Sequence, residues 1–481
     1  MSVVENSNSV ARIGVSHGLR DLPVRGDATP RQVVVWALLS TLCANGIFFT
    51  LYAALAWGTS VTSTFIASSI SGAVATVVAT LWLRLLSGGK AVQTAIVLAY
   101  VARLAVGVAL DGPTNYYGDG GYAAENPEYT WTYEMASKFA DCISHYGVFS
   151  PYGLSYWQED KNAGIHAWMG CFFAVGRSRN ALDLACFNAF HHALAGSLMA
   201  AVAFGLAYSK RASFLSGAVT AWIPWAFPAT IMWRDSVGFC WLVLAVLLLV
   251  YGRHVGLVAR LALMFPAALL AYCDRDPYVI VMAAAAIVPV TLWDYENERS
   301  LQKVGSYLMY ACGTAVLVSF AVLYPSAYQL VFERHPLYIQ EPGMQRALVL
   351  PLLVLRGVAG PFPWIQMDGT YDFDHLFDHV YHVFQLALFF TVVRHIREIL
   401  RNLNVLLLVA SSLWLIAIMA SGVHTAYIAI AVPFAFPAIF EAERRFGWQI
   451  VISVGIFIIA NLLYVAIGLH GAGAVLNRTG Y

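Results

Sequence analysis

The chain has 481 residues, of which 59% are apolar, 14% are aromatic and only 11% are charged. Soluble domains carry roughly 25% charged residues, so this composition excludes a cytosolic globular protein. The net charge of +1 leaves no general basic surface of the kind that binds nucleic acid through its phosphates. Because a membrane-spanning helix needs about 20 mostly apolar residues, the apolar content suffices for about a dozen spans. The composition therefore predicts an all-α polytopic membrane protein.

The chain begins with a polar segment, 1–32, and then alternates between apolar runs and polar segments. The first segment lacks a short apolar stretch followed by a small-residue cleavage site, so we expect the first span to be an uncleaved anchor. Runs near spanning length lie at 33–57, 61–86, 91–110, 184–207, 212–232, 236–251, 255–272, 277–293, 304–324, 379–393, 403–420, 423–440 and 447–469. We therefore expect about 13 transmembrane helices, grouped at 33–110, 184–324 and 379–481 around two long polar segments, 111–183 and 325–378.

The distribution of charge predicts the topology. If the N-terminus is cytoplasmic, the predicted inner segments hold 17 of the 28 basic residues but only 9 of the 27 acidic ones. These segments are 1–32, 84–90, 208–211, 252–260, 294–303, 394–402 and 441–446. This is the asymmetry expected from the positive-inside rule. Both long polar segments then lie on the extracytoplasmic face of the cell's inner (plasma) membrane, where we expect the functional site.

A shorter apolar run lies at 164–176, within the first long polar segment. It is too short to cross the bilayer comfortably, and a crossing there would invert every later loop and spoil the charge asymmetry. We therefore expect an interfacial or re-entrant helix over these residues.

The seven cysteines are scattered and show neither a CxxC pair nor a zinc-binding spacing. Most lie within apolar runs, which is typical of small core residues. Cys142 and Cys171 share the first long polar segment, so they could form a disulfide if that segment faces an oxidising compartment. Pairing and free thiols both remain open at this point.

The stretch 111–164 is acidic and rich in aromatic residues. It carries eight acidic residues against Lys138 and Lys161, together with eight tyrosines and two tryptophans. Such side chains suit a sugar, because tyrosine and tryptophan offer flat apolar faces and carboxylates accept hydrogen bonds from hydroxyl groups. The alternative is a solvated acidic loop with an aromatic belt at the membrane interface.

Asp119 stands out in this stretch because glycines flank it at 118, 120 and 121. Glycine lets the backbone fold tightly and brings a ligand close to the carboxylate, so Asp119 is a candidate general base. The same four residues also suit an ordinary turn, since aspartate and glycine satisfy turn geometry unaided.

Several short patterns resemble the C-type superfamily of lipid-dependent glycosyltransferases (GT-C), in particular its bacterial polysaccharide-assembly members. The patterns cover roughly residues 100–250, with a weaker echo at Gly360-Pro361-Phe362-Pro363-Trp364. They are Asp119 outside an early span, Tyr133-x-x-Ala136, Lys161-Asn162-Ala163-Gly164-Ile165 before a short helix, Asn188 in the next span, and Pro228 followed by Trp233-Arg234-Asp235-Ser236. The resemblance implies a polyprenyl-phosphate sugar donor and a loop carboxylate, here Asp119, as the base or acceptor-orienting group. The chain departs from the superfamily in having three predicted spans, not one, before this loop.

Transfer from a lipid phosphate also requires positive charge where the leaving phosphate gains negative charge, and arginine is the usual phosphate partner. Outer-face arginines are Arg234, Arg275, Arg334, Arg346 and Arg356. We expect Arg234, Asp235, Arg275 and Arg356 to bind substrate, although each charged corner, 234–235 and 274–276, could simply neutralise itself. Arg103 lies inside a predicted span, where a charge is costly, so it is a candidate for function. Alternatively, its side chain pairs with an acid or reaches the membrane interface.

The second long polar segment holds two further candidates. On a helix His375, Asp378, His379 and His382 share one face, an arrangement able to bind a divalent metal ion. The spacing matches no specific zinc motif, so a polar face just before a span is the alternative reading, and no cofactor is certain. Trp364, in a rigid apolar stretch that suits a lipid-tail groove, and His424, in a turn before a span, are additional candidates for substrate binding. The alternative for His424 is a histidine packed in the core.

The pattern favours an integral-membrane glycosyltransferase that moves a sugar from a polyprenyl-phosphate or diphosphate carrier to a glycan or lipid-linked acceptor, in cell-envelope or exopolysaccharide assembly. An O-antigen-type polymerase or ligase, which joins repeat units on polyprenyl diphosphate and relies more on arginines, is the second interpretation. A transporter or flippase for lipid-linked sugars is the third, and it requires polar residues deep in several spans. Apart from Arg103, Asn188, His191 and His192, the predicted spans are nearly free of them.

Overall fold

The computed structural model describes residues 28–56, 60–114, 127–147, 162–178, 180–206, 208–222, 235–251, 257–275, 278–292, 300–323, 391, 393–401, 408 and 425–443. Its elements are α1 (Pro30–Leu55), α2 (Val61–Ala79), η1 (Leu81–Leu85), α3 (Gly89–Thr114), α5 (Pro127–Tyr146), α7 (Ala163–Gly176), α8 (Ala181–Gly205), α9 (Lys210–Trp222), α11 (Asp235–Tyr251), α12 (Leu257–Asp274), α13 (Tyr278–Leu292), α14 (Ser300–Leu323), α19 (Ile396–Arg401) and α21 (Thr425–Ala442). None of the described residues is in a strand. The predicted all-α class is thereby confirmed for this part of the chain.

Three of the described helical stretches are long and apolar enough to cross a membrane: Arg31–Leu55, Thr62–Leu85 and Ala181–Gly205. They coincide with the first, second and fourth predicted spans. The other described helices except α5 and α19 also fall on predicted apolar runs, and α12 and α21 continue through Pro266 and through Pro433 and Pro437. These helices are compatible with a membrane protein, and the number of spans remains a prediction.

Local sequence explains where the long helices begin. Before α1, the Thr29 side chain accepts a hydrogen bond from Gln32 N, and Gln32 Oε1 accepts one from Thr29 N at 2.8 Å. This is a capping box, followed by a proline at the first helical position. Asn180 caps α8 in a similar way, since its side chain accepts from Leu182 N at 3.1 Å.

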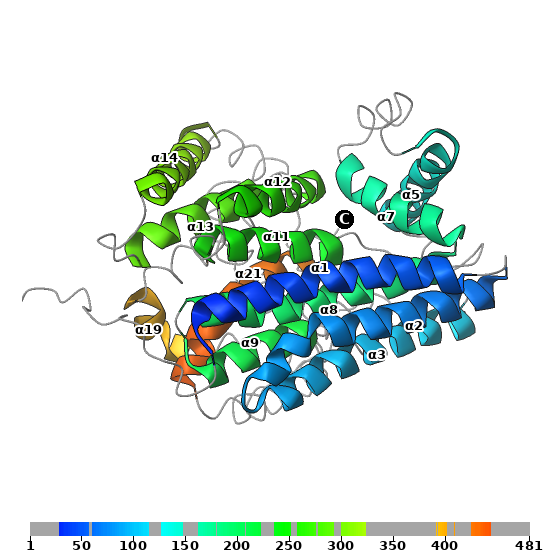
Figure 1. Cartoon of the computed structure of the whole chain (residues 1–481), viewed down its shortest axis with the longest axis horizontal. Coiled ribbons are helices and arrows are strands. Elements are labelled where there is room, and N and C mark those ends of the chain that lie inside the picture. The colour runs from blue at the N-terminus through cyan, green and yellow to red at the C-terminus, as the bar shows by residue number, and fades with distance from the viewer. Residues whose placement is uncertain are drawn as a thin grey trace, which may run out of the picture.

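Helix α8 is the centre of the bundle (Figure 1). Every residue of its apolar window is buried, and it contacts α1, α2, α3, α7, α9, α11 and α21. Its crossing with α9 is close because small residues meet there: Gly196 and Ala200 on α8 face Gly217 and Ala221 on α9. A Cβ on Gly196 or on Gly217 would overlap the other helix. Such small residues four apart are a common device for packing helices within membranes.

The N-terminal end of α8 is held by Asp183, which is fully buried. Its carboxylate accepts hydrogen bonds from Tyr52 Oη of α1 at 2.8 Å, from Ser68 Oγ of α2 at 2.8 Å and from Ser178 Oγ at 2.6 Å. Asp183 also lies in the first turn of α8, where a helix favours negative charge. One carboxylate thus joins three parts of the bundle at what we call the Asp183 end.

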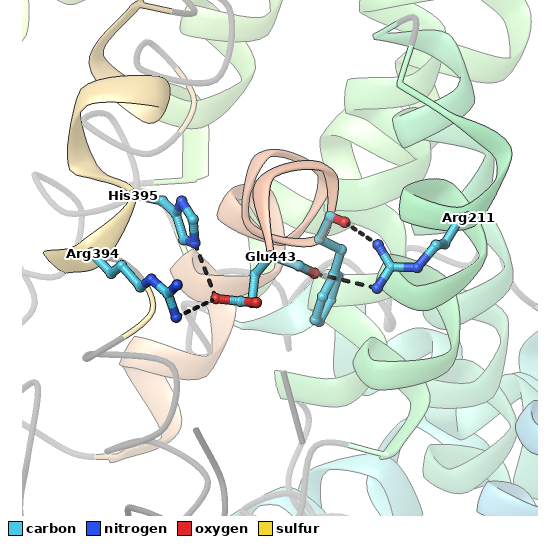
Figure 2. Close-up of polar contacts among 5 residues, drawn as sticks. Arg211, Arg394, His395 and Glu443 are labelled. Atoms are coloured by element: carbon cyan, nitrogen blue, oxygen red, sulfur yellow. Dashed lines mark hydrogen bonds and ion pairs between the residues drawn. The ribbon is translucent and has the colours of Figure 1, made fainter. Parts of the chain in front are cut away.

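The opposite end of α8 lies about 33 Å away, since 22 residues separate Asp183 from Gly205. Near it, Ser209 donates to Glu441 through its backbone N at 3.1 Å, and Arg211 donates to the carbonyls of Phe440 and Glu443. The Glu443 carboxylate also accepts from Arg394 at 3.2 Å and His395 at 3.1 Å (Figure 2). We call this the Glu443 end, and it brings together three segments that the charge pattern predicts to be cytoplasmic: 208–211, 394–402 and 441–446.

The first long polar segment contains a helix that the sequence patterns did not indicate. Helix α5 packs on α7, and the two lie together at one end of the long axis of the molecule, whereas α19 lies at the other (Figure 1). Gly170 of α7 permits this contact, because a Cβ there would overlap Phe139 and the backbone of Ala136 and Ala140. Helix α7 covers 163–176, as predicted, and also contacts α1, α8 and α12.

Candidate functional site

Charged residues gather where α11 begins, α12 ends and α13 begins. Arg275 donates from Nε to Asp235 Oδ1 at 3.0 Å and from Nη2 to Asp235 Oδ2 at 3.3 Å. Such two-point pairing fixes both the position and the plane of a guanidinium. The Asp235 side chain is 1% exposed and that of Arg275 is 13% exposed, so the arginine is the one that reaches toward the surface.

A second carboxylate, Asp274, lies beside this pair and is also buried. It packs against the first turn of α11, where a Cβ on Gly238 would overlap the Asp274 carboxyl group. Only glycine permits this approach, and the N-terminus of a helix is a favourable place for a negative charge. The fully buried ring of Tyr278, the first residue of α13, completes the group, and its backbone N donates to Arg275 O at 2.9 Å.

We call Asp235, Asp274, Arg275 and Tyr278 the corner cluster. It contains two buried carboxylates and one guanidinium among its four side chains, so its formal charge is negative when both acids are ionised. The Arg275 guanidinium is held in one orientation by Asp235. A guanidinium can also pair with phosphate oxygens in a two-point manner, but a phosphate at this corner would have to bind to Arg275 against the negative charge of Asp235 and Asp274.

The corner cluster belongs to the Asp183 end of the bundle. Helices α8 and α11 run parallel, because the Tyr251 ring lies where a Cβ on Gly205 would be, and the rings of His192 and Phe239 lie 6.3 Å apart. Asp235, at the start of α11, therefore lies toward the N-terminal end of α8. Asp235 and Arg275 join the charged corners 234–235 and 274–276 to each other.

Aromatic side chains connect this region to the first long polar segment. Trp168 of α7 packs edge to face on Trp241 of α11, with ring centroids 5.6 Å apart, and its Nε1 donates to His191 Nε2 at 3.2 Å. His191 Nδ1 lies 2.8 Å from Phe187 O. A neutral imidazole that donates from Nδ1 and accepts at Nε2 satisfies both contacts, so His191 has a structural role in seating α7 on α8 and α11.

Arg103 lies in the interior of the bundle and is 2% exposed. Its Nη2 donates to Ala221 O at 2.9 Å, and His192 Nε2 lies 2.9 Å from Thr220 O. These carbonyls belong to the last turn of α9, where a helix lacks its own partners and favours a positive charge. Arg103 therefore serves to cap α9.

The remaining predicted site residues lie outside the described residues. They are Asp119, Arg234, Arg356, Trp364, His424, and the proposed metal-binding set His375, Asp378, His379 and His382. Within the described part of the chain, no group of three or more His, Cys, Asp or Glu residues could hold a metal ion. Cys142 and Cys171 are both free thiols.

Two features of the structure were missed by reasoning from the sequence. The contact between Asp274 and Gly238 joins residues 36 positions apart, and the only available signal was a glycine in the first turn after a charged corner. Asp183 was assigned to the end of a loop, although an acid three residues after Asn180 is a recognisable helix start.

Comparison of this chain with protein-family models, with curated proteins and with solved structures gives no match, so its family and fold relatives are not shown by similarity.

Proposed function

We propose that this chain is an integral-membrane glycosyltransferase of the GT-C type, with about 13 spans and a cytoplasmic N-terminus. It transfers a sugar from a polyprenyl-phosphate or diphosphate carrier to an acceptor on the extracytoplasmic face. The observation that carries the proposal is the Arg275–Asp235 pair, which holds a guanidinium in a fixed orientation at the end of α12, since arginine is the usual partner of a phosphate.

The roles follow from the charges that change during the reaction. Negative charge grows on the departing lipid phosphate, and Arg275, with Arg234 and Arg356 as further candidates, stabilises it. Asp119 removes the proton from the acceptor hydroxyl group. Asp235 is a positioning residue because it acts through Arg275.

The contacts at the two ends of the bundle support the proposed sidedness. Three predicted cytoplasmic segments meet at the Glu443 end, whereas the corner cluster lies toward the N-terminal end of α8. The two ends of α8 are about 33 Å apart, which is close to the thickness of a bilayer's hydrocarbon core, about 30 Å. The proposed site would then lie at the outer membrane–water boundary, where a lipid-linked phosphate is found.

Contacts within the bundle account for three of the four polar residues that a transporter could use, Arg103, His191 and His192. Arg103 and His192 bind carbonyls at the end of α9, and His191 binds Trp168 and Phe187. Each of these contacts stabilises helix packing, so none of these side chains requires a transported substrate to explain it.

The reaction is tested with the full-length protein in nanodiscs and radiolabelled polyprenyl-phosphate sugars. We expect transfer of label to glycan, lost in Asp119→Asn and retained in Glu159→Gln, which removes another acid of the same loop. Transfer that survives Asp119→Asn would remove Asp119 as the base. Loss of product length in Arg275→Ala and Arg356→Ala, with Asp119→Asn active, would support the polymerase or ligase interpretation instead.

Sidedness is tested with single cysteines in a cysteine-free background. Tyr146 of α5 and Arg397 of α19 are both exposed, so both positions are available to a reagent. In intact cells a membrane-impermeant maleimide should label Tyr146→Cys and not Arg397→Cys, whereas both should react after the cells are opened. The reverse pattern would contradict the proposed topology.

A further inference from the structure

Helix α5 has one face packed on α7 and one face exposed. Its buried positions include Met135, Ala136, Phe139 and Ala140, which meet α7 near Gly170. The exposed positions recur with helical spacing and form what we call the α5 stripe: Trp131, Glu134, Lys138, Asp141 and His145. The stripe is therefore set by the way the helix is seated.

The stripe is held in place by the rest of the bundle. Close backbone approach at Gly170 fixes α5 on α7, and Tyr133 packs edge to face on Phe173 with ring centroids 6.1 Å apart. Helix α7 is in turn seated through Trp168 on α8 and α11, and α11 begins with Asp235 of the corner cluster. The α5 stripe is thus linked to the corner cluster through the packing of α5 on α7 and of α7 on α11.

The chemistry of the stripe suits a chain of sugars. Trp131 is 41% exposed, and its ring lies under Lys138 Nζ, 5.9 Å from the ring centroid, which holds the indole in one orientation. Beyond it come an acid, a base, an acid and an imidazole, which alternate hydrogen-bond acceptors and donors along the helix. Sugar rings present apolar faces to aromatic rings and hydroxyl groups to such side chains.

The charged residues of the α5 stripe argue that this face does not lie on a lipid surface. A helix that lies in the membrane interface keeps an apolar face for the acyl chains. The face of α5 that points away from α7 instead carries Glu134, Lys138 and Asp141 between its aromatic positions. Two acids in the middle of the stripe would also be repelled by anionic headgroups.

We propose that the α5 stripe binds the acceptor, and that the acceptor is an oligosaccharide. This inference rests on the proposed glycosyltransferase function. From Trp131 to His145 the stripe extends about 21 Å along the helix, which accommodates several sugar rings in a row. A single sugar would occupy only the Trp131 part of it.

Direct binding tests the proposal. The full-length protein in nanodiscs is applied to an array of bacterial cell-envelope oligosaccharides and of their component monosaccharides. We expect retention of at least one oligosaccharide and none of the monosaccharides, with affinity weakened roughly tenfold in Trp131→Ala and largely restored in Trp131→Phe. Tyr307→Ala is the matched control, because it truncates another exposed aromatic ring, on α14. No retention of any glycan, or equal retention by Trp131→Ala, would overturn the proposal.

Two further measurements separate this inference from its alternatives. In the transfer assay, Trp131→Ala should raise KM for the acceptor and leave kcat and donor binding unchanged. If Trp131→Ala transfers sugar with an unaltered KM for the acceptor, the α5 stripe does not bind the acceptor, but the proposed function stands. If glycan binding depends on Trp131 and no transfer occurs, the stripe binds a glycan and the proposed function is wrong. The fluorescence of Trp131 is the difference in emission between wild type and Trp131→Phe. If brominated phosphatidylcholine in the nanodiscs quenches this fluorescence, the ring lies in lipid, which would contradict glycan binding.

Discussion

The two ends of the bundle both contain a carboxylate bound by arginine, yet the two arginines differ in burial. At the Asp183 end, the buried acids Asp235 and Asp274 surround Arg275, whose side chain is 13% exposed. At the Glu443 end, Arg394 and His395 share one carboxylate, and Arg394 is 63% exposed. An ion pair by itself therefore says little about function, and the burial of the arginine distinguishes the two.

The physical consequence is a difference in how firmly the arginine is held. Arg394 at the Glu443 end is largely solvated, so its pair is screened by salt and opposed by side-chain entropy. Arg275 is largely desolvated and makes two hydrogen bonds to one carboxylate, which restricts its orientation. A binding residue needs the second arrangement, whereas anchoring a helix end needs only the first.

Arg275→Ala should have the largest effect. It leaves Asp235 buried without this partner, so we expect a loss of about 2–4 kcal/mol in the free energy of unfolding and at least a 100-fold loss of transfer activity. Denaturant unfolding in detergent and the transfer assay measure the two effects. Arg275→Lys separates them, because it keeps the charge and loses the two-point geometry; full activity of Arg275→Lys would mean that orientation is unimportant.

Gly238→Ala should be the next most severe change. The added Cβ would overlap the Asp274 carboxyl group, so the carboxylate or α11 must shift, at a cost of about 1–3 kcal/mol. Gly46→Ala in α1 is the matched control, because a Cβ there meets nothing within 4 Å and alanine is the better helix former. Equal unfolding free energies for the two variants would mean that the close packing of Asp274 is not needed.

A double-mutant cycle compares the two ion pairs directly. We expect a coupling free energy of about 1–2 kcal/mol between Asp235 and Arg275, measured by unfolding of Asp235→Ala, Arg275→Ala and the double variant. The same cycle on Glu443 and Arg394 should give less than about 0.5 kcal/mol. Similar coupling at both ends would remove the distinction on which the choice of site depends.

The sequence predicts the helices of the bundle better than it predicts the site. The apolar runs at 33–57 and 184–207 predicted α1 and α8 to within about three residues of their observed bounds. The short run at 164–176 coincides with α7. These features depend on local composition and length, which any apolar helix must satisfy. The sequence did not predict helix α5, because charged residues interrupt its apolar positions and the segment resembles a polar loop. Its apolar face becomes evident only from its packing on α7.

Contacts between distant residues could not be predicted in the same way. Asp235 and Arg275 were each recognised as candidates, but nothing in a single sequence shows that they pair with each other and not with their neighbours. Asp183 joins Tyr52 and Ser68, which are 131 and 115 residues away. Such pairings depend on which helix ends meet, and that follows from packing such as the Gly196–Gly217 crossing of α8 and α9.

Arg394→Ala should have the smallest effect of these changes. Its guanidinium is mostly in water, so removing it should alter the free energy of unfolding by no more than about 0.5 kcal/mol, and by less still in high salt. Arg211→Ala at the same end is the informative comparison, because Arg211 donates to the main-chain carbonyls of Phe440 and Glu443 at the end of α21. Loss of these capping bonds should cost about 1 kcal/mol with little dependence on salt, since the partners are partly buried carbonyl dipoles and not solvated ions. Unfolding of both variants in low and high salt measures this contrast. If Arg394→Ala were the more destabilising and salt-insensitive of the two, the Glu443 end would hold its arginine as firmly as the corner cluster does, and a firmly held arginine would no longer single out the corner cluster as the site.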